Sequence, residues 1–200
     1  MLAENFEAYR AGQRWLDGEQ HGQWWANYDG HGTTQVTNEG GYALSLSPRS
    51  AREPEVTHGG LVTTVKEFED IDLTTRLRTV RQLRVGTPNP WEVAWVLWHY
   101  TDDHHFYSLV LKPNGWELGK EDPAYRGAQR FLATGAMPSF PIGVQYTVRV
   151  QHVGDTIKIW ANGELLTTYT DSERPYFGGR VGLYTEDAQV AFDSVVVRRP

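Results

Sequence analysis

The chain has 200 residues, of which 40% are hydrophobic and 12% aromatic, with 20 glycines, 10 prolines and no cysteine. This composition suits one turn-rich domain with a real core, and it excludes disulfides, thiolate catalysis and cysteine-bound zinc. The net charge of -6 and the lack of a basic cluster argue against a general nucleic-acid binder, although a local basic cleft for an anionic polysaccharide stays open.

No stretch approaches the length of a membrane-spanning helix, so we expect no membrane partner. If a signal peptide has been removed, we expect an extracellular or periplasmic location. No feature of the sequence indicates an oligomeric state.

The first part of the chain is expected to form short strands and turns. The strands predicted there span 5–7, 34–37, 42–46, 61–64 and 70–78. Residues 9–22 are expected to be an irregular loop. The turn Asn38-Glu39-Gly40-Gly41 joins the second and third strands into a hairpin, because glycine supplies positive φ. The fifth strand alternates apolar and polar residues with period two.

The central stretch, residues 91–119, is rich in aromatic and branched residues. It predicts two long strands joined by a turn at 101–104, with apolar side chains on one face and stacking or titratable ones on the other. Such a strand pair is typical of a β-sheet binding cleft. Residues 121–140 show no strand pattern and are expected to form a loop over this cleft.

The last third of the chain predicts an antiparallel meander. Its strands are expected at 146–152, 156–160, 165–169, 180–185 and 190–198. Asn162-Gly163 is a strong hairpin turn. Without a convincing long helix, the class is all-β: one domain over residues 1–200, built as a two-sheet antiparallel β-sandwich.

Three short segments follow one another along the chain: residues 4–12 (ENFEAYRAG), 38–44 (NEGGYAL) and 191–197 (AFDSVVV). The first is similar to the opening of family 16 glycoside hydrolases, and the three in this order resemble the concanavalin A-like lectin and glucanase superfamily. The resemblance implies a jelly roll whose concave sheet faces a glycan. It also implies a structural Ca²⁺ held by the carbonyls of Asn5 and Gly40 and the carboxylate of Asp193. The alternative is that Asp193 caps a strand or pairs with an arginine.

The catalytic motif of those hydrolases is missing from the central stretch. It requires paired acids on one strand, and the strand that begins at Trp91 has only Glu92. The strand motifs of alginate lyases with the same fold are absent as well. The resemblance therefore implies a glycan-facing cleft without naming a reaction.

The candidate glycan-binding and catalytic residues are chosen by the chemistry of their side chains. Trp95 and Trp98 have opposite parity on a regular strand, and we expect Trp95 to face the cleft together with His99. The expected glycan-binding residues are Trp95, Trp116, Arg76, Arg78, Lys112 and Lys120. If the chain is an enzyme, the expected catalytic residues are His99, His105, Tyr107, Glu92 and Glu117. Stacking aromatics and cations suit sugar rings and uronates, while imidazole and phenol suit proton transfer. The alternative is that these groups pack in the core or lie in solvent.

Two classes of function stay open at this point. The first is a module that binds an oligo- or polysaccharide without cleaving it. The second is an enzyme on glycans, either a lyase that uses a histidine with Tyr107 or a hydrolase with scattered acids. A laminin-G-like protein-interaction domain is a further alternative.

Overall fold

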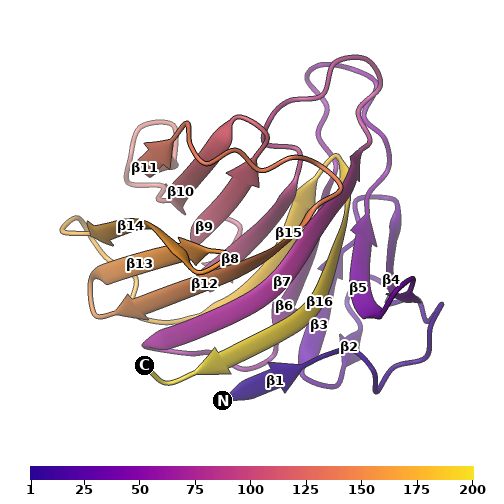
Figure 1. Cartoon of the computed structure of the whole chain (residues 1–200), viewed down its shortest axis with the longest axis horizontal. Coiled ribbons are helices and arrows are strands. Elements are labelled where there is room, and N and C mark those ends of the chain that lie inside the picture. Colours follow the sequence, from indigo (N-terminus) through magenta and orange to yellow (C-terminus); the bar gives the residue numbers. More distant parts are fainter.

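The computed structural model describes residues 1–200 and contains 16 strands and no helix. The strands form two antiparallel sheets of eight strands each, which Figure 1 shows as two layers. This confirms the all-β, two-sheet prediction, and the arrangement is consistent with a jelly roll. The structure has no helix of the length and apolarity needed to cross a membrane.

We call the two layers sheet A and sheet B. Sheet A consists, in spatial order, of β14 (Glu164–Thr170), β13 (Thr156–Ala161), β12 (Gln145–Val153), β7 (Ile71–Gln82), β16 (Ala188–Arg198), β5 (Tyr42–Ser47) and β4 (Thr33–Asn38), with β1 (Leu2–Glu4) paired to β16. Sheet B consists of β11 (Gln129–Gly135), β10 (Gly115–Glu121), β9 (His105–Lys112), β8 (Ala94–Asp102), β15 (Arg180–Glu186), β6 (Gly59–Thr64), β3 (Trp24–Tyr28) and β2 (Gln20–His21).

The main core lies between the sheets and follows from strand alternation. Along β7, Ile71, Leu73 and Leu77 are buried in this core, and the residues between them are more exposed. The register Leu2↔Val197 adds β1 to the same layer and brings the two ends of the chain together, as Figure 1 shows. The hairpin at Asn162 and Gly163 is confirmed, with φ values of 50° and 83°.

Several sequence predictions need correction. The first strand is Leu2–Glu4 rather than 5–7, because Phe6 adopts a φ of 61° and buries its ring in the core. The central stretch holds three strands rather than two, since β9 turns at residues 113–114 into β10. The region 121–140 contains the edge strand β11, and β3 was not expected at all.

A bulge interrupts β8 at His99. This residue has a φ of 49°, and the pairing of β8 with both of its neighbours shifts register nearby. A bulge re-aims a side chain. The His99 ring consequently lies in the interior, where its nitrogens are 2.9 and 2.8 Å from the carbonyl oxygens of Glu69 and Tyr176. The prediction that His99 shares a face with Trp95 is wrong for this reason.

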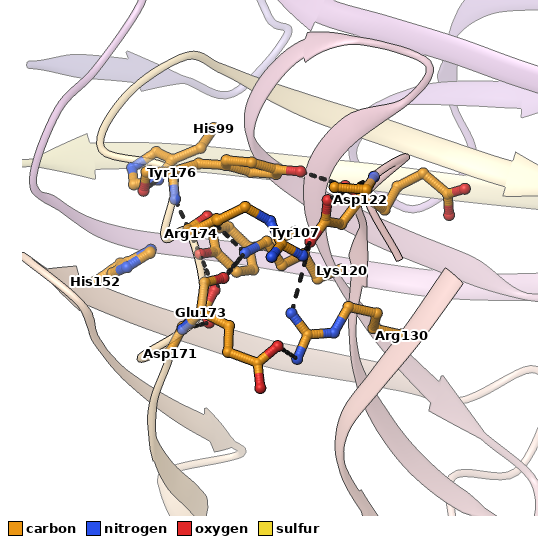
Figure 2. A network of polar contacts seen from close by, with 12 residues as sticks. His99, Tyr107, Lys120, Asp122, Arg130, His152, Asp171, Glu173, Arg174 and Tyr176 are labelled. Carbon is orange, nitrogen blue, oxygen red and sulfur yellow. Dashed lines mark hydrogen bonds and ion pairs between the residues drawn. The ribbon is translucent and has the colours of Figure 1, made fainter. Parts of the chain in front are cut away.

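A buried ion pair lies next to the bulge. The ammonium of Lys120 donates to Asp171 Oδ2 at 2.6 Å, and the Tyr107 hydroxyl donates to the same oxygen, also at 2.6 Å. Lys120 also donates to the carbonyls of Glu173 and Arg174 and lies 4.5 Å from the centre of the Tyr176 ring. The pair and its hydrogen bonds therefore fix the loop between β14 and β15 against sheet B, as Figure 2 shows.

Two histidines stack beside this pair. The rings of His99 and His152 are 4.6 Å apart between centroids, and Trp98 Nε1 donates to His152 Nδ1 at 3.0 Å. The other ring nitrogen of His152 has no partner. Burial, with a smaller effect from His99, lowers the pKa of His152 to about 3, and burial also lowers the pKa of His99. The His152 imidazole is therefore neutral at neutral pH.

An outer shell of charges closes the network toward solvent. Arg174 donates to Asp122 at 2.7 Å, and Arg130 pairs with Glu173 at 3.0 Å. Burial acts to raise the pKa of Asp122, but the hydrogen bond from Arg174, together with smaller effects, outweighs it. The pKa of Asp122 is therefore lowered. Figure 2 shows these pairs around Lys120 and Asp171.

Replacing Lys120 with methionine should destabilise the fold strongly. The change leaves the Asp171 carboxylate buried without its cation, which costs about 3–5 kcal/mol of the free energy of unfolding. Urea denaturation of Lys120→Met against wild type measures this loss. Lys158→Met is the matched control, because Lys158 is exposed on β13 and should stay within about 0.5 kcal/mol of wild type. Equal stability of the two variants would contradict the structural role of the pair.

The buried histidines should make the protein acid-sensitive. Their folded pKa values lie below the unfolded value, so the unfolded state binds more protons as pH falls below about 6.5. Stability should therefore fall between about pH 6.5 and 3, by about 1.4 kcal/mol per pH unit for each histidine that stays neutral. Urea unfolding of wild type and His152→Gln across this range measures the slopes. His152→Gln should lose stability less steeply than wild type as the pH falls, whatever its absolute stability. Identical slopes would show that His152 does not cause the acid sensitivity.

Candidate functional site

The outer face of sheet B carries a second apolar layer, separate from the main core. Trp95 and Leu97 belong to this layer, whereas Val96 and Trp98 point into the main core. Trp95 therefore faces outward, as the parity argument predicted. Its indole N–H donates to the Trp91 carbonyl at 2.7 Å, which fixes the ring orientation.

A cavity of about 330 Å³ opens above this layer, and we call it the tyrosine cavity. Tyr28 and Tyr100 donate their hydroxyls to one oxygen of Asp103, at 3.2 and 2.8 Å. Tyr184 donates to Glu186 Oε1 at 2.9 Å. The phenol rings give this cavity an apolar wall. Their hydroxyl groups and the carboxylates that accept from them give it a polar edge.

A neighbouring cavity of about 380 Å³, the lysine cavity, lies towards the β9–β10 turn. Lys112 and Glu117 line it and form an ion pair across that turn. Trp91 and Phe131 also line this cavity and are exposed by 42% and 57%. Cation, carboxylate and exposed aromatic rings therefore meet in one hollow.

The two cavities form one cleft, because Trp95, Gln129 and Glu186 line both of them. Trp95 comes from β8, Gln129 from the edge strand β11 and Glu186 from the end of β15. Register places Trp95 opposite Tyr184, two residues before Glu186. A ligand that spans the cleft would pass over this junction.

Two carboxyl groups of the cleft are shifted toward the protonated state. Burial raises the pKa of Glu186, and the charges of Asp187 and Glu92 add to the rise while the Tyr184 hydrogen bond opposes it. Burial also raises the pKa of Glu121, which lines the tyrosine cavity. Carboxyls with raised pKa in a cleft are candidates for proton transfer.

The cleft tyrosines, in contrast, are held as neutral phenols. Burial is the largest cause of the raised pKa of Tyr28, Tyr100 and Tyr184, and the nearby carboxylates of Asp103 and Glu186 add to it. Each hydroxyl already donates its proton to one of these carboxylates, so it offers a ligand its acceptor lone pairs, and as a neutral phenol it is a poor base.

A buried charge cluster supports the junction from below. Arg84 pairs with Glu92 and, at 2.8 Å, with Asp187, the residue that follows Glu186. Asn89 donates to Glu92 at 2.8 Å. Glu92 was expected to be catalytic, but its side chain is only 1% exposed and is engaged by Arg84, so it lies beneath the cleft rather than in it.

Four of the expected site residues line the cleft: Trp95, Lys112, Glu117 and Lys120, although the Lys120 ammonium is turned into the interior ion pair. The other seven lie elsewhere, and the reasons are structural. His99 and Tyr107 point into the interior polar network, as described above. Trp116 packs in the main core and donates to the Met137 carbonyl at 3.0 Å. His105 lies at the β8–β9 turn, where it bonds Asp102 at 2.8 Å.

Arg76 and Arg78 belong to β7 and hence to sheet A, the layer opposite the cleft. The burial of His99 and Tyr107 also removes the imidazole–phenol pair from any open cleft. Sequence reasoning missed Tyr28, Tyr184 and Glu186, and it placed Glu121 and Gln129 only within the segment 121–140 expected over the cleft. The alternation in β15, where Tyr184 and Glu186 are half-buried between buried neighbours, is the signal that could have identified two of them.

Asp193, the carboxylate ligand expected for calcium, already has partners within the protein. The Asp193 carboxylate pairs with Arg76 at 2.7 Å and also accepts from Gln145, so a protein cation already faces it. Gly40 and Asp193 line a shared hollow that does not include Asn5. No group of three or more acidic, histidine or cysteine side chains is arranged to hold a metal ion. Calcium binding stays a prediction, which melting with and without a chelator tests.

Solved structures with the same fold cover nearly the whole chain. A carbohydrate-binding module, CBM66, from Bacillus subtilis superposes with a TM-score of 0.64 at 16% identity, covering 92% of this chain and 96% of the module. A mixed-linkage glucan GH16 protein of Bacteroides ovatus, solved in complex with a product, gives a TM-score of 0.63 at 10% identity, covering 98% of this chain and 99% of that protein. At these identities the likeness shows a shared fold.

A glycoside hydrolase family protein from Mycobacterium thermorestibile gives a TM-score of 0.62 at 14% identity, with 98% of this chain and 99% of that chain covered. No curated protein matches the sequence. A family model described as a 3-keto-alpha-glucoside-1,2-lyase-like domain matches residues 13–198, almost the entire sandwich and all of the cleft. The chain therefore belongs to the 3-keto-alpha-glucoside-1,2-lyase-like domain family.

Proposed function

We propose that this protein binds a saccharide in the cleft of sheet B and cleaves a keto-glycoside there by elimination. One observation carries the proposal. Glu186, a carboxyl group with a raised pKa, lies at the junction of the two cavities, beside the outward face of Trp95. A titratable group between two adjoining hollows is placed for chemistry at the bond that joins two ligand units.

The lining of the cleft suits sugars. Trp95 and the exposed Trp91 and Phe131 offer apolar surfaces for the C–H face of a pyranose. The Gln129 amide and the Tyr184 hydroxyl offer hydrogen bonds for sugar hydroxyls. The structural similarity to the carbohydrate-binding module CBM66 and to the GH16 protein solved with a glucan product supports a ligand of the same class.

The family description suggests the reaction type. A carbonyl at C3 of a glucoside acidifies the proton at C2. In the elimination a base removes that proton, the C2–H electron pair forms the C1=C2 double bond, and the C1–O bond breaks. The departing oxygen then takes a proton from an acid. The products are an unsaturated keto sugar and a free alcohol.

Residues of the cleft can fill these roles. Glu186 is the proposed base, since its raised pKa makes the ionised carboxylate more basic. Lys112 in the lysine cavity stabilises the negative charge that develops on the C3 oxygen. Glu121 in the tyrosine cavity protonates the departing oxygen, because burial favours its protonated form. The keto sugar accordingly occupies the lysine cavity and the leaving group the tyrosine cavity.

A second candidate function is binding without cleavage. The exposed aromatic rings of Trp91 and Phe131 at the edge of the cleft favour it, because such rings hold sugar chains without taking part in chemistry. The hydrolase alternative is weaker, since Glu92, one of the two acids expected to serve it, is buried against Arg84.

Glu186→Gln should abolish most of the elimination and leave binding intact. Purified protein is incubated with a 3-keto-α-glucoside and, separately, with its parent α-glucoside, and the conjugated enone product is followed by ultraviolet absorbance. Loss of the base should lower kcat by about 10²- to 10⁴-fold. The affinity for the uncleaved parent glucoside should change little, because the amide has the same shape.

Glu164→Gln is the matched control, since Glu164 is exposed on β14 and distant in topology from the cleft. It should retain wild-type turnover. Unchanged turnover in Glu186→Gln would refute the assigned base. Saturable binding of both glucosides by wild type with no enone formed would favour the binding module over the lyase.

A further inference from the structure

A polar cavity lies on the outer face of sheet A, opposite the cleft. It has a volume of about 290 Å³, and none of its lining residues is hydrophobic. Neighbouring strands build its floor through the cross-strand pairs Thr33↔Ser47 and Gln35↔Ser45. No role was expected for these residues from the sequence, and the proposed elimination does not use them.

Two arginines border this cavity, and neither has a carboxylate partner. Arg14 donates to Thr33 Oγ1 at 2.7 Å, and Arg81 donates to Gln189 Oε1 at 2.9 Å. No acidic side chain lies within 4.0 Å of either guanidinium, and no acidic residue lines the cavity. On a chain with a net charge of -6, an acid-free hollow with two unpaired guanidinium groups is distinctive.

The arginine and serine side chains of this cavity also keep hydrogen-bond donors that a ligand can use. The hydrogen bonds to Thr33 and Gln189 hold one N–H of each arginine and orient the rest of the fork. Ser45 and Ser47 line the cavity with hydroxyl groups that make no hydrogen bond inside the protein. Ser45 is only 5% exposed, so its position in the sheet is fixed by the strands on either side of it.

We propose that this cavity of sheet A binds an oxyanion, namely a carboxylate or sulfate. Guanidinium groups bind such planar or tetrahedral anions through charge-assisted hydrogen bonds, and serine hydroxyls supply further donors. The polar lining gives no surface for an apolar or stacking ligand. The anion is either carried by an acidic saccharide or free in solution, and the two sources share the same recognition chemistry.

Isothermal titration calorimetry at constant ionic strength tests this site. The probes are a glucuronate-containing disaccharide, its neutral glucose analogue and sodium sulfate. Arg14→Gln and Arg81→Gln should each weaken binding of the anionic probes about tenfold, which corresponds to the loss of one charge-assisted interaction. Ser45→Val, which puts a methyl group where a hydroxyl donor was, should weaken it as well. A uronate that binds more tightly than sulfate identifies a saccharide as the source, and the reverse order identifies the free ion.

Arg52→Gln is the matched control, because Arg52 is exposed and makes no ion pair or side-chain hydrogen bond. It removes the same charge and should leave affinity unchanged. Equal affinity in wild type, Arg14→Gln and Arg81→Gln would overturn the proposal, as would an equal loss in Arg52→Gln. Glu186 belongs to sheet B, so Glu186→Gln should not alter anion binding. Failure of the anion-site proposal and failure of the proposed elimination are therefore distinguishable.

Discussion

The side chains of β8 alternate between two apolar layers, and the arrangement of the whole molecule depends on this. Val96 and Trp98 pack in the core between the sheets, while Trp95 and Leu97 form the floor of the cleft. Because neighbouring strands share this phase through their pairing, β9 and β15 present their outward residues to the same side. One sheet thus serves both as a wall of the core and as the floor of the cleft.

The local order of apolar, polar and turn-forming residues was sufficient to predict much of this fold. The period-two alternation of β7, the Asn162-Gly163 turn and the opposite parity of Trp95 and Trp98 are all found where the sequence placed them. What local pattern could not reveal was the backbone irregularity at His99, since a bulge leaves no mark in the order of apolar and polar residues. The buried destination of Lys120 was missed for a different reason, because its partner Asp171 is 51 residues away in the sequence.

The cleft was predicted only in part because it is assembled from distant segments. Trp95, Lys112 and Glu117 come from the central stretch, and the sequence places them near one another. Glu186 joins them only through the pairing of β15 with β8, which brings together residues almost a hundred positions apart. Its raised pKa also depends on burial and on the charges of Asp187 and Glu92, which no local pattern contains.

The bulge at His99 divides β8 into two segments whose side-chain phases are independent. Residues before it set the floor of the cleft, and Tyr100 after it sets the edge, where its hydroxyl meets Asp103. A change in the length of the β8–β9 turn would therefore be absorbed at the bulge and would not rotate Trp95 away from the ligand. The edge of this cleft can therefore change its shape in evolution or design while the floor stays the same.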